Sequence, residues 1–181
     1  MQDGPDRERR AAASRVTIRA PLAADIPALT EAANQPGVRR GTLRLPFTGE
    51  EFLRRRLLEP PPGMHNVVAE LEGRAIGQGA LVLGQGRQRH KGEVFLFVHD
   101  ASWRRGAGRA ILGALLDLAD SWYGLTRISL EVMASNAAAI ALYRQAGFEE
   151  EGRLRADTLC EGRLEDVLAM ARLRPPPERA P

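Results

Sequence analysis

The sequence contains a single cysteine, Cys160, and this scarcity excludes several kinds of protein. One cysteine cannot form an internal disulfide, and it cannot supply a cysteine-rich zinc site. We therefore interpret Cys160 as a buried apolar thiol within a strand rather than as a nucleophile, and we expect the chain in the cytoplasm. No apolar run approaches the roughly 18 residues that a membrane-spanning helix needs, so no membrane partner is expected.

The sequence also lacks a large excess of charge of one sign. The 26 basic and 23 acidic side chains leave a net charge of +3, an excess too small to predict nucleic-acid binding. No histidine–carboxylate spacing indicates a metal, and none is expected. Segment 1–14 lacks the apolar region of a signal peptide, and 174–181 is rich in proline. Both are predicted to be disordered tails around one domain at 15–173.

Apolar patterning predicts a mixed α/β domain in the order βα-αββ-βαβα-ββ. Residues 94–98 are all apolar, so their strand is expected to be central in the sheet. Thr48 is expected to cap the second helix, with Glu51 completing a capping box. The preceding segment 37–46 is expected to be irregular. A long helix is predicted to carry one apolar stripe, formed by Ile111, Leu115, Leu118 and Trp122.

A glycine-containing turn follows the apolar strand and leads into the long helix; it reads Trp103-Arg104-Arg105-Gly106-Ala107-Gly108-Arg109. Glycines let the backbone N–H groups point into one concavity, where the helix N-terminus adds partial positive charge. Such a turn binds a phosphate or pyrophosphate. Two known nucleotide-binding motifs do not match this turn. The Gly-Lys-Ser/Thr of Walker A is absent, and the dinucleotide fingerprint needs a third glycine where Ile111 stands.

The turn resembles the pyrophosphate loop of the GNAT superfamily of N-acetyltransferases, Gln/Arg-x-x-Gly-x-Gly/Ala, with Trp103 departing from the pattern at the Gln/Arg position. Residues 136–148 match every anchor of a second family signature, N-x-x-A-x-x-x-Y-x-x-x-G-F. The similarity extends over roughly 15–173. The pattern of 147–152 and 162–166 is similar to the branch that acetylates amino acids and other small amines.

The resemblance implies an α/β GNAT (acyl-CoA N-acyltransferase) fold, with a mixed, mostly antiparallel sheet of six to seven strands and about four helices. It implies acetyl-CoA as cosubstrate, and direct acetyl transfer in a ternary complex to the primary amine of a small molecule such as an amino acid. Acetylation of a protein N-terminus or lysine remains an alternative, as does a non-catalytic acyl-CoA sensor. A homodimer built through the last strands is a further family-level expectation.

The resemblance also assigns cofactor-binding roles. The central strand is expected to splay from its neighbour and to leave the backbone of Phe97, Val98 and His99 free for the pantetheine arm. Asn136 and Tyr143 are seven residues apart on one helix face, about 10 Å along its axis. In the family, the asparagine bonds the pantetheine amides and the tyrosine protonates the departing thiolate. The expected cofactor contacts are Phe97, Val98, His99, Arg104, Arg105, Gly106, Ala107, Gly108, Arg109, Asn136, Ala139 and Tyr143.

The acceptor amine must lose a proton before it attacks. Glu93 is the first candidate for the general base and is predicted to be catalytic with Tyr143; Glu131 is the second, and a water chain is an equal alternative. His90 and His99 are also possible proton acceptors, but they are interpreted as solvated loop histidines; His90 could still line the acceptor site. Arg153, Arg155 and Arg163 are interpreted as a solvated strand face, although one of them could bind an acceptor carboxylate. The same holds for Arg39, Arg40 and Arg44, whose segment forms one wall of the acceptor pocket in the family.

Overall fold

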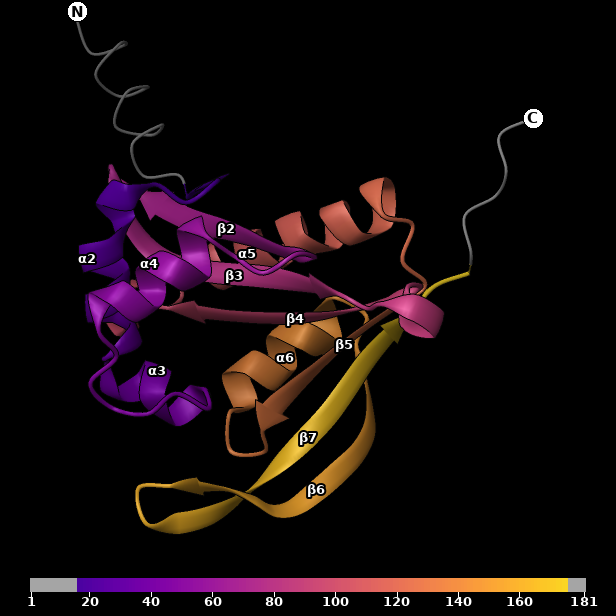
Figure 1. Cartoon of the computed structure of the whole chain (residues 1–181). Helices are drawn as coiled ribbons and strands as arrows, with labels where there is room; N and C mark the ends of the chain where they lie inside the picture. The colour runs from indigo at the N-terminus through magenta and orange to yellow at the C-terminus, as the bar shows by residue number, and fades with distance from the viewer. Residues whose placement is uncertain (1–15, 176–181) are drawn as a thin grey trace, which may run out of the picture.

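A computed structural model describes residues 16–175, and a seven-stranded sheet runs through them (Figure 1). Its order is β1-β2-β3-β4-β5-β7-β6, and every pair except β4–β5 is antiparallel, which confirms the predicted mixed sheet. The strands are β1 (Thr17–Arg19), β2 (Met64–Leu71), β3 (Arg74–Leu83), β4 (Lys91–Val98), β5 (Arg127–Met133), β6 (Glu149–Cys160) and β7 (Arg163–Leu173). The predicted tails lie almost wholly outside the described residues.

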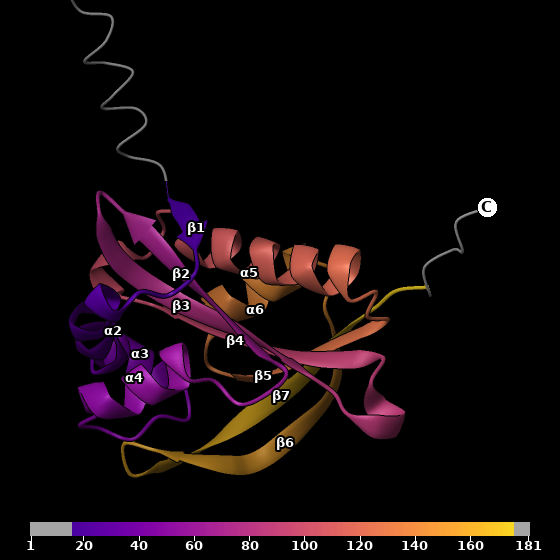
Figure 2. The same ribbon diagram turned by 45° about the horizontal axis from the view of Figure 1, so that its top comes forward.

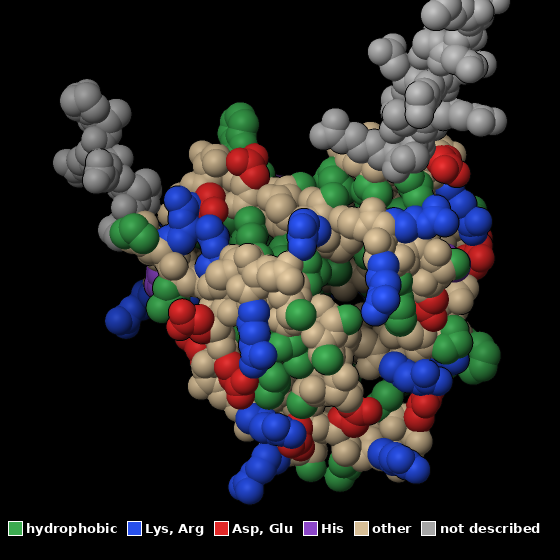
Figure 3. All heavy atoms as spheres, turned by 180° about the vertical axis from the view of Figure 1, so that it is seen from behind, with side chains coloured by type: hydrophobic (Ala, Val, Ile, Leu, Met, Phe, Trp, Pro, Cys, Tyr) green, Lys and Arg blue, Asp and Glu red, His purple; other side chains and the backbone are tan. Residues whose placement is uncertain are grey.

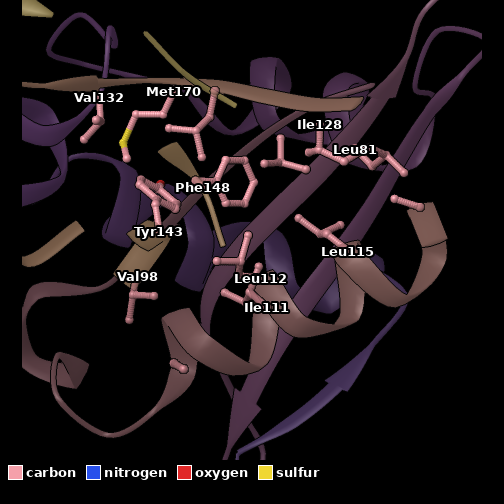
Figure 4. Close-up of a cluster of buried hydrophobic side chains, with 14 of the residues drawn as sticks. Leu81, Val98, Ile111, Leu112, Leu115, Ile128, Val132, Tyr143, Phe148 and Met170 are labelled. Atoms are coloured by element: carbon pink, nitrogen blue, oxygen red, sulfur yellow. The ribbon is translucent and has the colours of Figure 1, made fainter. Parts of the chain in front are cut away.

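Helices cover both faces of the sheet (Figure 2). On one face, α2 (Ile26–Ala33), α3 (Pro36–Gly41) and α4 (Glu50–Leu58) enclose a buried cluster that includes Leu29, Leu53 and Phe97. On the other, α5 (Ala107–Asp117) and α6 (Ala137–Gln145) contribute to a larger cluster with Ile111 and Tyr143, drawn in Figure 4. Alternating residues of the strands therefore serve two separate cores.

The segment before α4 differs from its prediction in two ways. Residues 36–41 form a helix rather than an irregular segment, because a proline is readily accommodated in the first turn and Pro36 begins α3. The predicted capping box at Thr48 is wrong, since α4 begins at Glu50 with Gly49 before it. The Asn34 side chain bonds the backbone N–H and C=O of Thr48, each at 2.9 Å, and holds that residue outside the helix.

The predicted apolar stripe of the long helix is correct at Ile111, Leu115 and Leu118, the last of which packs partly buried against the core, and it is wrong at Trp122. Ile111 and Leu115 are fully buried, but α5 ends at Asp117 and continues as a π-helical turn over Leu118–Trp122. A π-turn holds more residues than an α-turn and so rotates the positions that follow. Trp122 is consequently 78% exposed.

We predict that the close packing of α5 on β3 requires Gly79. A Cβ there would lie 2.3 Å from the Ile111 Cγ2 atom, so Gly79→Ala should lower the free energy of unfolding by about 1–3 kcal/mol. Gly113→Ala is the matched control, because Gly113 lies on the exposed face of α5 with nothing within 4 Å. It should raise stability by about 0.5–1 kcal/mol. Urea denaturation measures both; an equally stable Gly79→Ala protein contradicts this packing.

Candidate active site

The central strands β4 and β5 separate part-way along their length. They pair only over Lys91–Glu93 and 127–129, and beyond these residues they diverge (Figure 1). A cavity of about 790 Å³ opens there, lined by both strands and by residues of α3, α4, α5 and α6. The central strands therefore part, as the family resemblance implied, and they do so directly after Glu93.

The phase of the β4 backbone decides which groups face this opening. In an antiparallel ladder, the N–H and C=O groups of every second residue face the same neighbour. His99 donates its N–H to the carbonyl oxygen of Ile76 at 2.8 Å, so His99 and Phe97 face β3. Leu96 and Val98 therefore face the gap. This corrects the expectation that the backbone of Phe97 and His99 is unpaired; the Phe97 side chain nevertheless lines the cavity.

The glycine-containing turn lies at one end of the cavity. Gly106 precedes α5 with φ +84°, and Arg104 also adopts a left-handed conformation, with φ +62°. The first backbone bond into the helix is donated by Ala110 to Gly106, at 2.9 Å. Within the described residues, the N–H groups of residues 107–109 have no partner, as is usual at a helix start. They form an anion site at the positive end of the α5 dipole.

The arginines of this turn differ in their surroundings. Arg104 lines the cavity together with Gly106, Ala107 and Gly108, whereas Arg105 and Arg109 do not. Arg109 instead donates to the Gln145 side chain of α6 at 2.7 Å. Of the predicted loop, the three small residues and one of the three arginines, Arg104, therefore line the cavity.

Trp103 joins the turn to the acceptor side of the cavity. Its indole N–H donates to the Val98 carbonyl oxygen at 2.8 Å, and its ring packs against Gly37 of α3, where a Cβ would lie 2.3 Å from Cη2. Asp100 accepts the Gly37 N–H at 2.8 Å. These contacts account for a tryptophan at the Gln/Arg position. They also occupy the Val98 carbonyl, which leaves its N–H facing the gap.

Helix α6 places Asn136, Ala139 and Tyr143 on the cavity wall. The Asn136 side chain accepts the Ala139 N–H at 3.1 Å and caps the helix, while its Nδ2 atom lies beside Gly41 of α3. Tyr143 is 7% exposed, and this burial raises its pKa to about 12. Its ring lies against Phe148 with centroids 5.9 Å apart (Figure 4). Its hydroxyl bonds no described residue, so the phenol is protonated and free to donate.

The other end of the cavity is lined by carboxylates, aromatic rings and arginines. Glu93 and Glu131 both line it, from β4 and β5. The wall from α3, α4 and their connection contributes Arg40, Leu43, Arg44, Phe52 and Arg56. Sequence reasoning missed Phe52 and Arg56, although their spacing of four places them on one face of α4.

Three residues considered for this end lie elsewhere. Neither His90 nor Arg39 lines the cavity. The His99 ring is turned toward the loop, where its Nδ1 atom accepts the Ala101 N–H at 3.1 Å, and its Nε2 atom lies 3.4 Å from Glu31.

The described surface carries mixed charge, with Lys and Arg interspersed among Asp and Glu on the face in Figure 3. Within residues 16–175, no group of three His, Cys, Asp or Glu side chains is arranged to hold a metal ion. In the same range, no helix is long and apolar enough to cross a membrane.

Free N–H groups at the start of α5 fit a pyrophosphate, and the unpaired N–H groups of Leu96 and Val98, with the Leu96 carbonyl, fit the amides of a pantetheine arm. The model of the Acetyltransferase (GNAT) family matches residues 29–148. The chain belongs to the GNAT acetyltransferase family. Acetyl-CoA is the cosubstrate that this GNAT site accommodates.

Individual GNAT relatives are similar to this protein over most of its chain. L-amino acid N-acetyltransferase AaaT of Escherichia coli K12 is 30% identical over 162 residues, which are 89% of this chain and 99% of that protein. The crystal structure of ribosomal-protein-alanine N-acetyltransferase from Brucella melitensis has a TM-score of 0.73 at 30% identity, covering 87% of this chain and 99% of that one. The structure of yncA from Salmonella typhimurium with its cofactor acetyl-CoA has a TM-score of 0.73 at 25% identity, covering 87% and 93%. This GNAT chain is an acetyl-CoA-dependent N-acetyltransferase.

We predict that Gly106→Ala weakens acetyl-CoA binding about tenfold or more. Alanine at φ +84° is strained by about 1–2 kcal/mol, and relieving that strain moves the N–H groups of the turn. Gly73→Ala is the matched control, since this hairpin glycine has φ +78° and nothing within 4 Å of its added Cβ. It should leave the dissociation constant unchanged, as measured by titration calorimetry. Equal affinities in the two variants would remove the turn from the binding site.

Proposed function

We propose that this enzyme transfers the acetyl group of acetyl-CoA directly to the primary amine of a small molecule such as an amino acid, within a ternary complex. The observation that carries the proposal is one continuous cavity, which is lined by the glycines of the turn, by Tyr143 and by Glu93 and Glu131. Cosubstrate and acceptor can therefore be present together. Similarity to the L-amino acid N-acetyltransferase of E. coli supports a small acceptor.

Each step of the transfer has a group in this cavity suited to it. The thioester supplies an activated acetyl carbon, and the amine nitrogen bonds to that carbon as the carbon–sulfur bond breaks. The free N–H groups of Leu96 and Val98 can stabilise charge that develops on the carbonyl oxygen. Tyr143 gives a proton to the departing sulfur. An ammonium acceptor loses two protons overall: one reaches solvent through Glu93, and the other balances the proton from Tyr143.

Tyr143→Phe should lower kcat by about a hundredfold or more, because the ring stays packed while the acid is lost. The KM for acetyl-CoA should stay within about twofold, since little binding is removed. Tyr123→Phe is the matched control: Tyr123 is the other tyrosine of the chain, and its hydroxyl meets His65 at 2.8 Å on the surface. Steady-state kinetics measure both. An unchanged kcat in Tyr143→Phe would remove this residue from the chemistry.

The proton acceptor is tested by Glu93→Gln beside Glu131→Gln. If Glu93 is the base, its variant should lose kcat/KM about a hundredfold near neutral pH. The loss should shrink as the pH rises, because more of the acceptor amine is then already deprotonated. Glu131→Gln should have the smaller effect. A pH–rate profile identical to that of the unmodified enzyme in both variants would favour a water chain instead.

A protein N-terminus is the second candidate acceptor, and the similarity to a ribosomal-protein-alanine N-acetyltransferase supports it. A sensor without turnover is the third, and it gives no reason for a buried, protonated phenol in the same cavity as two carboxylates. We also propose a cytoplasmic homodimer formed through the β6–β7 hairpin, whose exposed leucines Leu154, Leu159 and Leu164 support such a contact.

A further inference from the structure

Two arginines at the acceptor end of the cavity have no carboxylate partner. Arg44 and Arg56 both line the cavity, and no described carboxylate oxygen lies within 4 Å of either guanidinium. Arg40 lines the same wall and is different, since its Nε atom lies 3.1 Å from Glu161 at the tip of the β6–β7 hairpin. The wall therefore offers two unpaired cations.

Aromatic rings support these two cations but do not satisfy their N–H donors. The Arg44 guanidinium lies 5.2 Å from the centroid of Phe97, and that of Arg56 lies 4.7 Å from Phe95. Such cation–π contacts offset part of the cost of removing a charge from water. The Nε atom of Arg56 is nonetheless buried without a hydrogen-bond partner. Burial, together with the neighbouring charge of Arg56, lowers the pKa of Arg44 to about 10.

The rings beneath the arginines stand beside the candidate base. Glu93, Phe95 and Phe97 alternate along β4, so their side chains project from the same face of the sheet. Successive residues on such a face are about 7 Å apart. The acceptor end thus has carboxylates on β4 and β5, and it has guanidinium groups on α4 and on the connection between α3 and α4, so a short molecule can reach both.

We propose that the acceptor carries a carboxylate as well as its amine, and that Arg44 and Arg56 bind that carboxylate. The proposal rests on the proposed function and specifies its substrate class. A guanidinium presents paired N–H donors that match the two oxygens of a carboxylate. The ammonium group of the same acceptor would then face Glu93 and Glu131. A polyamine would meet like charge at this wall, and a peptide N-terminus has an amide where a free amino acid has its carboxylate.

The first test compares matched acceptors with the unmodified enzyme. L-amino acids and the corresponding L-amino acid amides share the amine and side chain, and they differ only in the carboxylate. We expect kcat/KM for the preferred amino acid to exceed that of its amide by about a hundredfold, and spermidine to be poorer still. An amide or spermidine that is acetylated as well as the acid overturns the proposal. Failure of every amine overturns the proposed function itself.

The second test changes the arginines. Methionine keeps the apolar length that packs on the rings, so Arg44→Met and Arg56→Met should fold as the parent does. Each should raise KM for the amino acid at least tenfold, reduce the preference for acid over amide, and leave KM for acetyl-CoA unchanged. Arg55→Met is the control, because Arg55 is the neighbour of Arg56 on α4, is exposed, and pairs with Glu51 at 2.7 Å.

Binding provides a second readout that does not depend on turnover. Calorimetric titration of the amino acid into enzyme saturated with coenzyme A should give a dissociation constant at least tenfold weaker in Arg44→Met and Arg56→Met than in Arg55→Met. If both variants keep the affinity and the acid-over-amide preference of the parent, the carboxylate is bound elsewhere and the proposal is wrong.

Discussion

The parting of β4 from β5 after Glu93 is the constraint on which the rest of the molecule depends. A sheet normally pairs the N–H and C=O groups of its central strands, and buried unpaired groups are costly. Here each strand keeps its other neighbour over its full length: β4 stays paired with β3 to Val98, and β5 with β7 to Met133. The sheet can therefore open in its middle without coming apart, and the open edges offer backbone groups to an extended ligand.

The elements around the opening give its two ends different chemistry. At one end the N-terminus of α5 concentrates unpaired N–H groups, which suit the phosphates of the cosubstrate. At the other, carboxylates on the strands oppose arginines on α4 and on the connection between α3 and α4. Tyr143 reaches the space between them from α6, anchored in the core by its ring. Trp103 and Asp100 contact α3, which lines the acceptor end, and they lie in or next to the turn at the phosphate end. These contacts connect the two ends of the cavity.

What could be predicted from the sequence depended on contiguous motifs. The turn before α5 and the signature over 136–148 are local patterns, and each correctly indicated the position of its helix. Most of the residues that they marked line the cavity, whereas Arg105 and Arg109 do not. Features set by distant contacts could not be found in this way. Asn34 withdraws Thr48 from its expected cap across 14 positions, and the phase of the β4 backbone depends on a bond from His99 to Ile76. Arg56 had no motif at all, because its significance arises only where α4 meets β4.

Free-thiol release from acetyl-CoA, measured together with mass spectrometry of the acceptor across amino acids, polyamines and peptides, tests acetyl transfer by this enzyme most directly. We predict that thiol release requires an added amine, that it matches the appearance of the N-acetyl product in equal amounts, and that a small amine is among the acceptors used. Binding of acetyl-CoA with no acetylated amine in any class, or no binding of acetyl-CoA at all, would contradict this prediction.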